Sequence, residues 1–253
     1  MRHGTFGHLV NPAGKNANYH QRGGGAGGVD LPTPTAYYPF DANANDVCAN
    51  PCNLTNFLAY TGATGKVNNA RLFGSSQVAS CPSSVSKFDP VGGAWTLACW
   101  VYHETTTNHY APGVFVNGNA SDNSQPNAPR VGIWYITGSG VQANVDTGAK
   151  GGSYLATAPG TTSLPAATWY LLTARYSAGT LYVSVNNGTE GSVAVPDMTF
   201  GTGFGRMLIR NYTSSNTRVD EVGWWKGIAL NATYRTTLYN NGNGRTFNGT
   251  IWT

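Results

Sequence analysis

The chain has 253 residues, of which 10% are charged and 40% apolar, and its formal net charge is +4. A charge this small, spread without long basic runs, argues against a nucleic-acid partner, because nucleic-acid-binding domains usually carry a basic stripe. No stretch approaches the roughly 18 consecutive apolar residues of a membrane-spanning helix, so we expect no membrane span. The low share of charge and the 33 glycines favour short β-strands joined by tight loops.

Residues 1–33 differ from the rest of the chain. They include the glycine-rich run RGGGAGG and follow neither helical nor strand periodicity, so we expect them to be disordered in isolation. They also lack the apolar run of a secretory signal, which predicts release into the cytosol of the cell that makes the protein. We interpret them as an extended arm that anchors to neighbouring protein subunits through basic and flexible residues: Arg2, His3, Lys15, Arg22, Gly23, Gly24 and Gly25.

Two of the four cysteines, Cys48 and Cys52, frame the loop CANPC. Their spacing is compatible with a disulfide and equally with two free thiols. We expect no zinc site, because no second close pair of cysteines supplies the other two ligands. Cys99 lies in a strand pattern and is predicted to be a small buried side chain.

From Thr35 onward the apolar residues alternate with a period of two, which predicts strands at a regular spacing and hence a two-sheet sandwich. The clearest predicted strands are residues 35–40, 95–103, 130–136, 141–146, 168–176, 180–186, 205–211 and 218–225. One short helix is predicted after the last strand. Asn231 is its expected N-cap, and Gly242 is expected to end it in the left-handed conformation.

Together these segments resemble the laminin-G-like, concanavalin A-like lectin/glucanase jelly rolls over residues 36–244. The marks are AYYPFD, ATGKVNNARLF, WTLACWVY, TWYLLTARYSAGTLYVSVNNG and VDEVGWWKGIAL, in this order. The resemblance implies an all-β domain over residues 34–253: a two-sheet antiparallel jelly-roll sandwich with one short C-terminal helix, outside which lies the N-terminal arm. It implies no cofactor and leaves open a structural calcium ion near Asp41, although Ala42 stands where the family often has an acidic residue.

The stretch VDEVGWWKGIAL holds two adjacent carboxylates and two adjacent tryptophans. Alternation along a strand sends Asp220 and Glu221 to opposite faces, whereas a glycosidase needs two carboxyl groups facing each other across a cleft. The E-x-D-x-x-E pattern of the related glucanases is also absent. We therefore predict no catalytic residues and no enzymatic activity. The carboxylates are expected to accept hydrogen bonds from a neighbouring loop, and one of Trp224 and Trp225 is expected to face the core.

Metal-ligating residues gather in HETTTNHY, which contains His103, Glu104 and His109. The two histidines lack the i, i+4 spacing of a helical metal site, so a solvated loop is the default interpretation and a metal site the alternative.

Three aromatic residues, Trp100, Tyr102 and Trp134, alternate with predicted core residues and should point away from the core. On an open concave face they would stack on sugar rings, whereas under covering loops they would be packing residues. The sequence favours neither interpretation.

The arm favours a non-catalytic structural protein of a larger assembly. The specific hypothesis is a phage virion decoration protein on a capsid or tail, whose arm binds neighbouring subunits and whose jelly roll projects outward and adheres to glycans. The alternative is an extracellular, free or cell-surface carbohydrate-binding lectin with the arm as a tether. Jelly rolls serve many roles, so this choice rests on the arm more than on the sandwich.

Overall fold

The computed structural model describes residues 29–55, 60–75, 77–82, 84–90, 93–105, 113–117, 130–147, 152–196, 205–211 and 215–253. The seven named residues of the predicted arm, and His109, lie outside these ranges.

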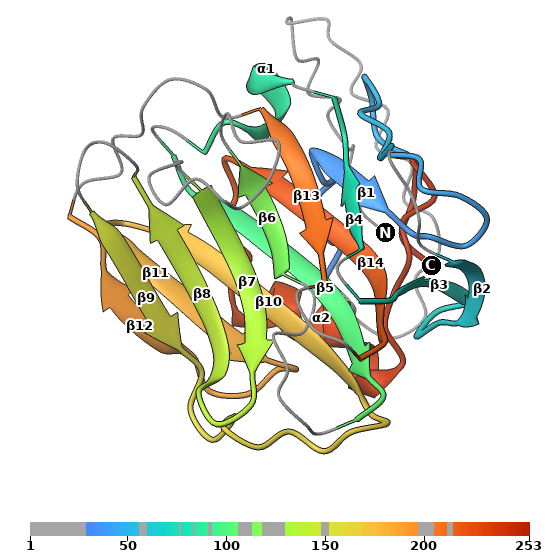
Figure 1. The fold of residues 1–253 in the computed structure, drawn as a ribbon. Coiled ribbons are helices and arrows are strands. Elements are labelled where there is room, and N and C mark those ends of the chain that lie inside the picture. Colours follow the sequence, from blue (N-terminus) through green and yellow to red (C-terminus); the bar gives the residue numbers. More distant parts are fainter. Residues whose placement is uncertain are drawn as a thin grey trace, which may run out of the picture.

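Two antiparallel sheets stack face to face (Figure 1). Sheet A has eight strands in the order β12 (Gly191–Ala194), β11 (Thr180–Val185), β10 (Trp169–Ser177), β5 (Trp95–His103), β14 (Thr217–Lys226), β3 (Asn69–Phe73) and β2 (Tyr60–Thr64), with β1 (Ala36–Tyr38) also paired to β14. Sheet B has six: β4 (Val78–Ser80), β13 (Arg206–Arg210), β6 (Gly113–Asn117), β7 (Arg130–Ile136), β8 (Gly140–Asp146) and β9 (Ser153–Thr157). The predicted jelly-roll sandwich is confirmed.

The main core lies between the two sheets and follows the period of two. On β5, Trp95, Leu97 and Cys99 face this core, while Ala98 and Trp100 face the other side of sheet A. Each large apolar side chain buried in this way contributes about 1.5–3 kcal/mol to the free energy of unfolding. The alternation read from the sequence therefore decides which side chains fill the sandwich.

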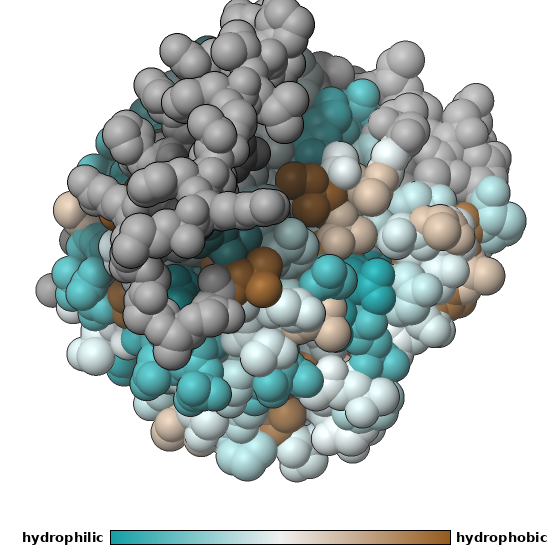
Figure 2. Space-filling model, turned by 180° about the vertical axis from the view of Figure 1, so that it is seen from behind, coloured by the Kyte–Doolittle hydropathy of each residue, from teal (hydrophilic) through white to brown (hydrophobic). Residues whose placement is uncertain are grey.

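A second apolar cluster covers the outer face of sheet A. It joins Trp100 and Trp225 to Leu238 of helix α2 (Ala232–Tyr239) and to Phe247 of the C-terminal segment. Leu31 packs into the same cluster, and the Trp225 Nε1 atom donates to the carbonyl of Pro32 at 2.9 Å. The packed domain thus begins slightly before the predicted boundary at residue 34. Figure 2, which views this side, shows mostly hydrophilic or neutral residues with small hydrophobic spots between them.

Helix α2 begins as predicted and ends earlier. The Asn231 side chain accepts a hydrogen bond from the Tyr234 N atom at 3.1 Å, which makes Asn231 the N-cap. Asn240, with φ 49°, takes the left-handed position expected for Gly242. Asparagine tolerates this conformation better than most residues, so it can end a helix where glycine is absent. A second, one-turn helix, α1 (Val85–Phe88), was not predicted from the sequence.

Candidate carbohydrate-binding surface

Strand β14, which carries the two adjacent carboxylates, does not keep strict alternation. Its pairing with β5 shifts register between Asp220 and Gly223, and Glu221 has φ 51°. A bulge of this kind inserts one extra residue, so Val219 and Val222 both face the main core. Asp220 and Glu221 consequently both lie on the outer side of sheet A. The prediction that they point to opposite faces is wrong.

Both carboxylates nevertheless serve the scaffold, as expected. The Asp220 Oδ2 atom accepts from the backbone N atoms of Lys66 and Val67 at 2.8 and 3.0 Å, and the Glu221 Oε2 atom accepts from the Tyr37 hydroxyl at 2.5 Å. Burial is the main reason that the pKa of Asp220 is raised and that the pKa of Glu221 rises to about 10. Because Asp220 is 0% and Glu221 3% exposed, neither can reach a substrate.

The adjacent tryptophans divide between the two clusters. Trp224 belongs to the main core and Trp225 to the second cluster, which confirms the expectation that only one faces the core.

The predicted metal-ligating stretch is divided between core and surface. His103 stacks on Tyr135 and Tyr170, its Nε2 atom lies 3.2 Å from the Leu164 carbonyl oxygen, and burial lowers its pKa. Glu104 pairs with Arg218 at 3.2 Å. Within the described ranges, no group of three or more His, Cys, Asp or Glu residues could hold a metal ion. The calcium ion near Asp41 stays a prediction.

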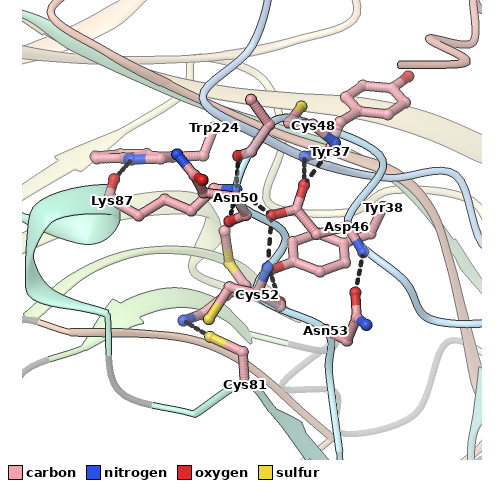
Figure 3. A network of polar contacts seen from close by, with 12 residues as sticks. Tyr37, Tyr38, Asp46, Cys48, Asn50, Cys52, Asn53, Cys81, Lys87 and Trp224 are labelled. Carbon is pink, nitrogen blue, oxygen red and sulfur yellow. Dashed lines mark hydrogen bonds and ion pairs between the residues drawn. The ribbon is translucent and has the colours of Figure 1, made fainter.

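The CANPC loop is organised by a carboxylate instead of a disulfide (Figure 3). Cys48 and Cys52 are free, buried thiols, and they belong to the second cluster and the main core respectively. Asp46 stands between them, because Oδ1 accepts from Cys48 N and Oδ2 from Cys52 N, both at 3.0 Å. Burial also raises the pKa of Cys48 to about 12, which leaves little reactive thiolate.

The structure does not bring the three predicted sugar-binding aromatic residues together. Trp100 is 1% exposed and stacks on Tyr239 at 5.7 Å between ring centroids, so it is a packing residue. Tyr102, also on sheet A, is half-buried and lies 5.4 Å from Trp169. Trp134 lies on β7 in sheet B, on the opposite side of the molecule, where it too is half-buried.

The outer face of sheet B surrounds Trp134 with amide side chains. Trp134 pairs with Gln142 on β8, and its Nε1 atom donates to the Gln142 Oε1 atom at 3.2 Å. Asn144 follows on the same face of β8, and its Nδ2 atom donates to the Ser153 Oγ atom at 3.1 Å. The Asn144 Oδ1 atom is buried without a hydrogen-bond partner. Asn144 is 4% and Gln142 9% exposed, so the half-buried Trp134 ring is the more accessible part of this group.

Two glycines shape the aromatic part of this face. A Cβ atom at Gly113 would lie 2.0 Å from the Phe115 ring, and one at Gly132 would lie 2.3 Å from it. Only glycine at both positions lets this ring lie against the sheet beside Trp134, with 5.7 Å between the two ring centroids. The sequence analysis missed Phe115, Gln142 and Asn144. The available signal was Gly132 inside a strand, which often marks a close approach.

Phe115 is 3% exposed and Trp134 is half-buried, so Trp134 is the ring of this pair that has surface for binding. Aromatic rings offer an apolar surface to the C–H face of a sugar, and amides donate to and accept from its hydroxyl groups. A glycosidase would need two facing carboxyl groups. Over the part of this face that the structure describes, Asp146 is the sole carboxylate, and it lies 3.9 Å from the Arg130 Nη2 atom.

The two stacked antiparallel sheets define a jelly roll. Residues 73–234 match the family model described as the Concanavalin A-like lectin/glucanases superfamily, and the chain belongs to this family. The resemblance noted from the sequence is thereby confirmed. Among curated proteins, no sequence matches the chain.

Several solved structures share the fold. The binding domain of botulinum neurotoxin serotype C1 is 10% identical, with a TM-score of 0.60 over 81% of this chain and 51% of that one. The binding domain of Paraclostridial Mosquitocidal Protein 1 is 12% identical, with a TM-score of 0.60 over 84% of this chain and 52% of that one. Domain 4 of AbnA, an extracellular arabinanase from Geobacillus stearothermophilus, is 20% identical, with a TM-score of 0.56 over 82% of this chain and 98% of that one.

The chain thus spans about half the length of the toxin binding domains that it matches. At sequence identities this low, the structural similarity establishes the fold alone. These three neighbours are binding domains or an accessory domain rather than catalytic ones. Neither described α-helix has the length and apolar character needed to cross a membrane.

Proposed function

We propose that the chain is a non-catalytic carbohydrate-binding domain whose ligand site is the outer face of sheet B. The observation that carries this proposal is the half-buried Trp134 ring on the outer face of sheet B, whose Nε1 atom is held by the Gln142 amide of the neighbouring strand. A sugar ring stacked on Trp134 would bring its hydroxyl groups to the amides of β8.

The neighbouring folds support this proposal without deciding it. Domain 4 of AbnA was solved in complex with arabinotriose. A botulinum neurotoxin DC binding domain was solved with SialylT, and entry of neurotoxin type C depends on two ganglioside molecules. This chain matches only about half of the toxin binding domains, so their ligands are not transferred to it. They suggest only that sugars are the ligand class to test first.

The test compares the wild type with Trp134→Ala. A glycan array first identifies the ligands that bind, and calorimetry then measures the affinity for the best ligand and for arabinotriose. Loss of the stacking surface should weaken binding about tenfold or more. The matched control is Trp169→Ala, which removes another half-buried tryptophan, on the outer face of sheet A. Unchanged binding in Trp134→Ala, or an equal loss in Trp169→Ala, would place the ligand elsewhere.

A second level of function concerns residues 1–33. We propose that this arm fixes the domain to a larger assembly, specifically a virion surface, so that the sugar-binding face projects outward. The support is the glycine-rich sequence of the arm. Leu31 and Pro32 pack against sheet A, so the arm would leave the domain on the side opposite the proposed sugar site.

Deletion of residues 1–28 tests this second level, because it leaves Leu31 and Pro32 in place. The shortened protein should keep its melting temperature and its glycan binding, while it no longer joins a particle or oligomer. Normal assembly of the shortened protein would refute the anchoring role and favour the alternative, a free or cell-surface lectin. The chain's partners would then be glycans alone.

A further inference from the structure

Two of the four cysteines lie next to each other in the main core, although they are far apart in sequence. Cys52 belongs to the loop between β1 and β2, and Cys81 directly follows β4. Both side chains are buried in the core between the two sheets. Figure 3 shows them on the side of Asp46 that is away from the Cys48 thiol. The pair therefore stands where a loop of sheet A meets the edge strand of sheet B.

Backbone hydrogen bonds hold the segments of the two cysteines together. Thr55 and Ser80 form an antiparallel bridge, in which each backbone N atom donates to the carbonyl oxygen of the other residue, at 2.7 and 3.2 Å. The Cys52 thiol donates to the carbonyl oxygen of Pro82 at 3.1 Å. The Cys52 sulfur atom thus lies beside the residue that follows Cys81.

The two thiols also interact with each other. Burial is the main reason that the pKa of Cys81 is raised, and a hydrogen bond with the Cys52 thiol is the next cause. The other two cysteines have different surroundings. Burial raises the pKa of Cys48 most and charged neighbours shift it further, whereas burial is the cause of the raised pKa of Cys99. Cys52 and Cys81 are therefore the two thiols whose sulfur atoms are placed to bond.

We propose that Cys52 and Cys81 form a disulfide bond when the chain folds under oxidising conditions. With glutathione disulfide as the oxidant, one cysteine thiolate attacks it, forms a mixed disulfide and releases one glutathione thiolate. The second cysteine thiolate then attacks the protein sulfur atom of the mixed disulfide and releases the second glutathione. The cysteines lose two protons and two electrons, which convert glutathione disulfide into two glutathione thiols. The new bond closes a loop of about 30 residues.

Burial decides when this bond can form. A buried thiol with a raised pKa holds little thiolate, so the folded, reduced protein should react slowly with glutathione disulfide. In the unfolded chain the thiols are exposed, with ordinary pKa values of about 8.5, and they should react while the chain folds. The completed bond fixes the CANPC loop to the edge of sheet B, in addition to the ion pair between Asp46 and Lys87.

The experiment refolds the full chain from urea, either with dithiothreitol or with a mixture of oxidised and reduced glutathione. Remaining thiols are alkylated, and tryptic peptides are analysed by mass spectrometry without reduction. Trypsin cleaves after Lys66 and Arg71, so it separates the two cysteines unless they are bonded. We expect the peptide with Cys52 to be linked to the peptide with Cys81. The oxidised protein should melt about 5–10 °C above the reduced one.

Cys48→Ala is the matched control, because Cys48 lies on the same tryptic peptide as Cys52. This variant should keep the linked peptides. Cys81→Ala should lack them, and its melting temperature should not respond to dithiothreitol. Four alkylated cysteines after refolding with glutathione would overturn the proposal, and so would a bond between Cys48 and Cys52 or loss of the link in Cys48→Ala. The peptide map of the wild type gives its result even if a variant fails to fold.

Discussion

Glu221 is a buried carboxyl group in a left-handed backbone conformation at the bulge of β14. Such a conformation costs a non-glycine residue about 1–2 kcal/mol. The bulge turns Glu221 toward the Tyr37 hydroxyl, at the side of sheet A that the C-terminal segment covers. The hydrogen bond of Glu221 thus connects the last strand to the first one. The strained backbone and the desolvated carboxyl group oppose this stabilisation.

The first prediction follows from the protonation of Glu221. Its ordinary pKa is 4.5 and its pKa in the fold is about 10, so its contribution to the free energy of unfolding is complete below about pH 4.5. That contribution is lost progressively as the pH rises toward 10, by at most about 1.4 kcal/mol per pH unit. Glu221→Gln has no proton to lose. Urea unfolding of the variant should therefore depend less steeply on pH than that of the wild type.

The control for this prediction is Glu104→Gln, which removes a carboxyl group from the surface. Its unfolding by urea is followed over the same pH range, and a change as large as that of Glu221→Gln would mean that the effect is not specific to the buried carboxyl group. Coincident pH profiles of the wild type and Glu221→Gln would show that the Glu221 carboxyl is ionised in the fold.

At the scale of elements, a buried ion pair connects helix α1 to the loop that follows β1. Lys87 pairs with Asp46, and its Nζ atom also donates to the carbonyl oxygens of Ala49 and Asn50 at 3.0 Å each. The Asp46 carboxylate accepts from the backbone N atom of Tyr37 at 3.1 Å, which adds β1 to the network (Figure 3). One carboxylate and one ammonium group thereby hold an irregular segment that has almost no strand pairing of its own.

The second prediction concerns Lys87→Met. It leaves the carboxylate of Asp46 buried without its cation, which should lower the free energy of unfolding by about 3–5 kcal/mol. Lys226→Met is the matched control, because the Lys226 Nζ atom donates to the carbonyl of Ser86, also in α1, at the exposed surface. The control should cost less than about 1 kcal/mol. Chemical denaturation measures both, and equal costs would refute the special role of the buried pair.

The strands show how well the bounds of an element can be predicted from its own residues. Residues 95–103 and 130–136 were predicted with the bounds that the structure has, because both strands alternate over seven or more residues. Short strands such as β4 and β12 have no such run, and only their neighbours hold them in a sheet. The bulge in β14 was missed because the sequence analysis assumed strict alternation along this strand. Its residue Asp220 accepts a hydrogen bond from the Lys66 N atom, which is far away in sequence.

At the scale of the whole molecule, the domain has two apolar layers instead of one. The second layer, on the outer face of sheet A, contains Trp100 and Trp225 and is closed by α2 and the C-terminal segment. The Trp252 ring stacks on Trp225 at 6.1 Å between ring centroids, and Tyr239 covers Trp100. The proposed sugar site lies on sheet B, because the outer face of sheet A is occupied by the chain's own C-terminal residues.

The third prediction is that removal of residues 231–253 exposes this second layer. Each large apolar side chain laid bare costs about 1.5–3 kcal/mol, and the uncovered surface should drive self-association. Size-exclusion chromatography and binding of a hydrophobic dye would detect both effects. The shortened chain without residues 1–28 serves as the control and should stay as stable as the full chain. A monomeric C-terminal truncation with the wild-type melting temperature would contradict the covering role.

The amino-acid sequence by itself determined the class of fold, most strand positions, the start of the C-terminal helix and the division of Trp224 and Trp225 between two faces. These features follow from periodicity and capping, which act over a few neighbouring residues. Only the tertiary structure decided that Trp100 is covered and that Cys48 and Cys52 face different clusters. It also decided that Trp134 lies beside Gln142 of β8 and Phe115 of β6. Those facts depend on which strands lie side by side, and strand order is set by packing between residues far apart in the chain.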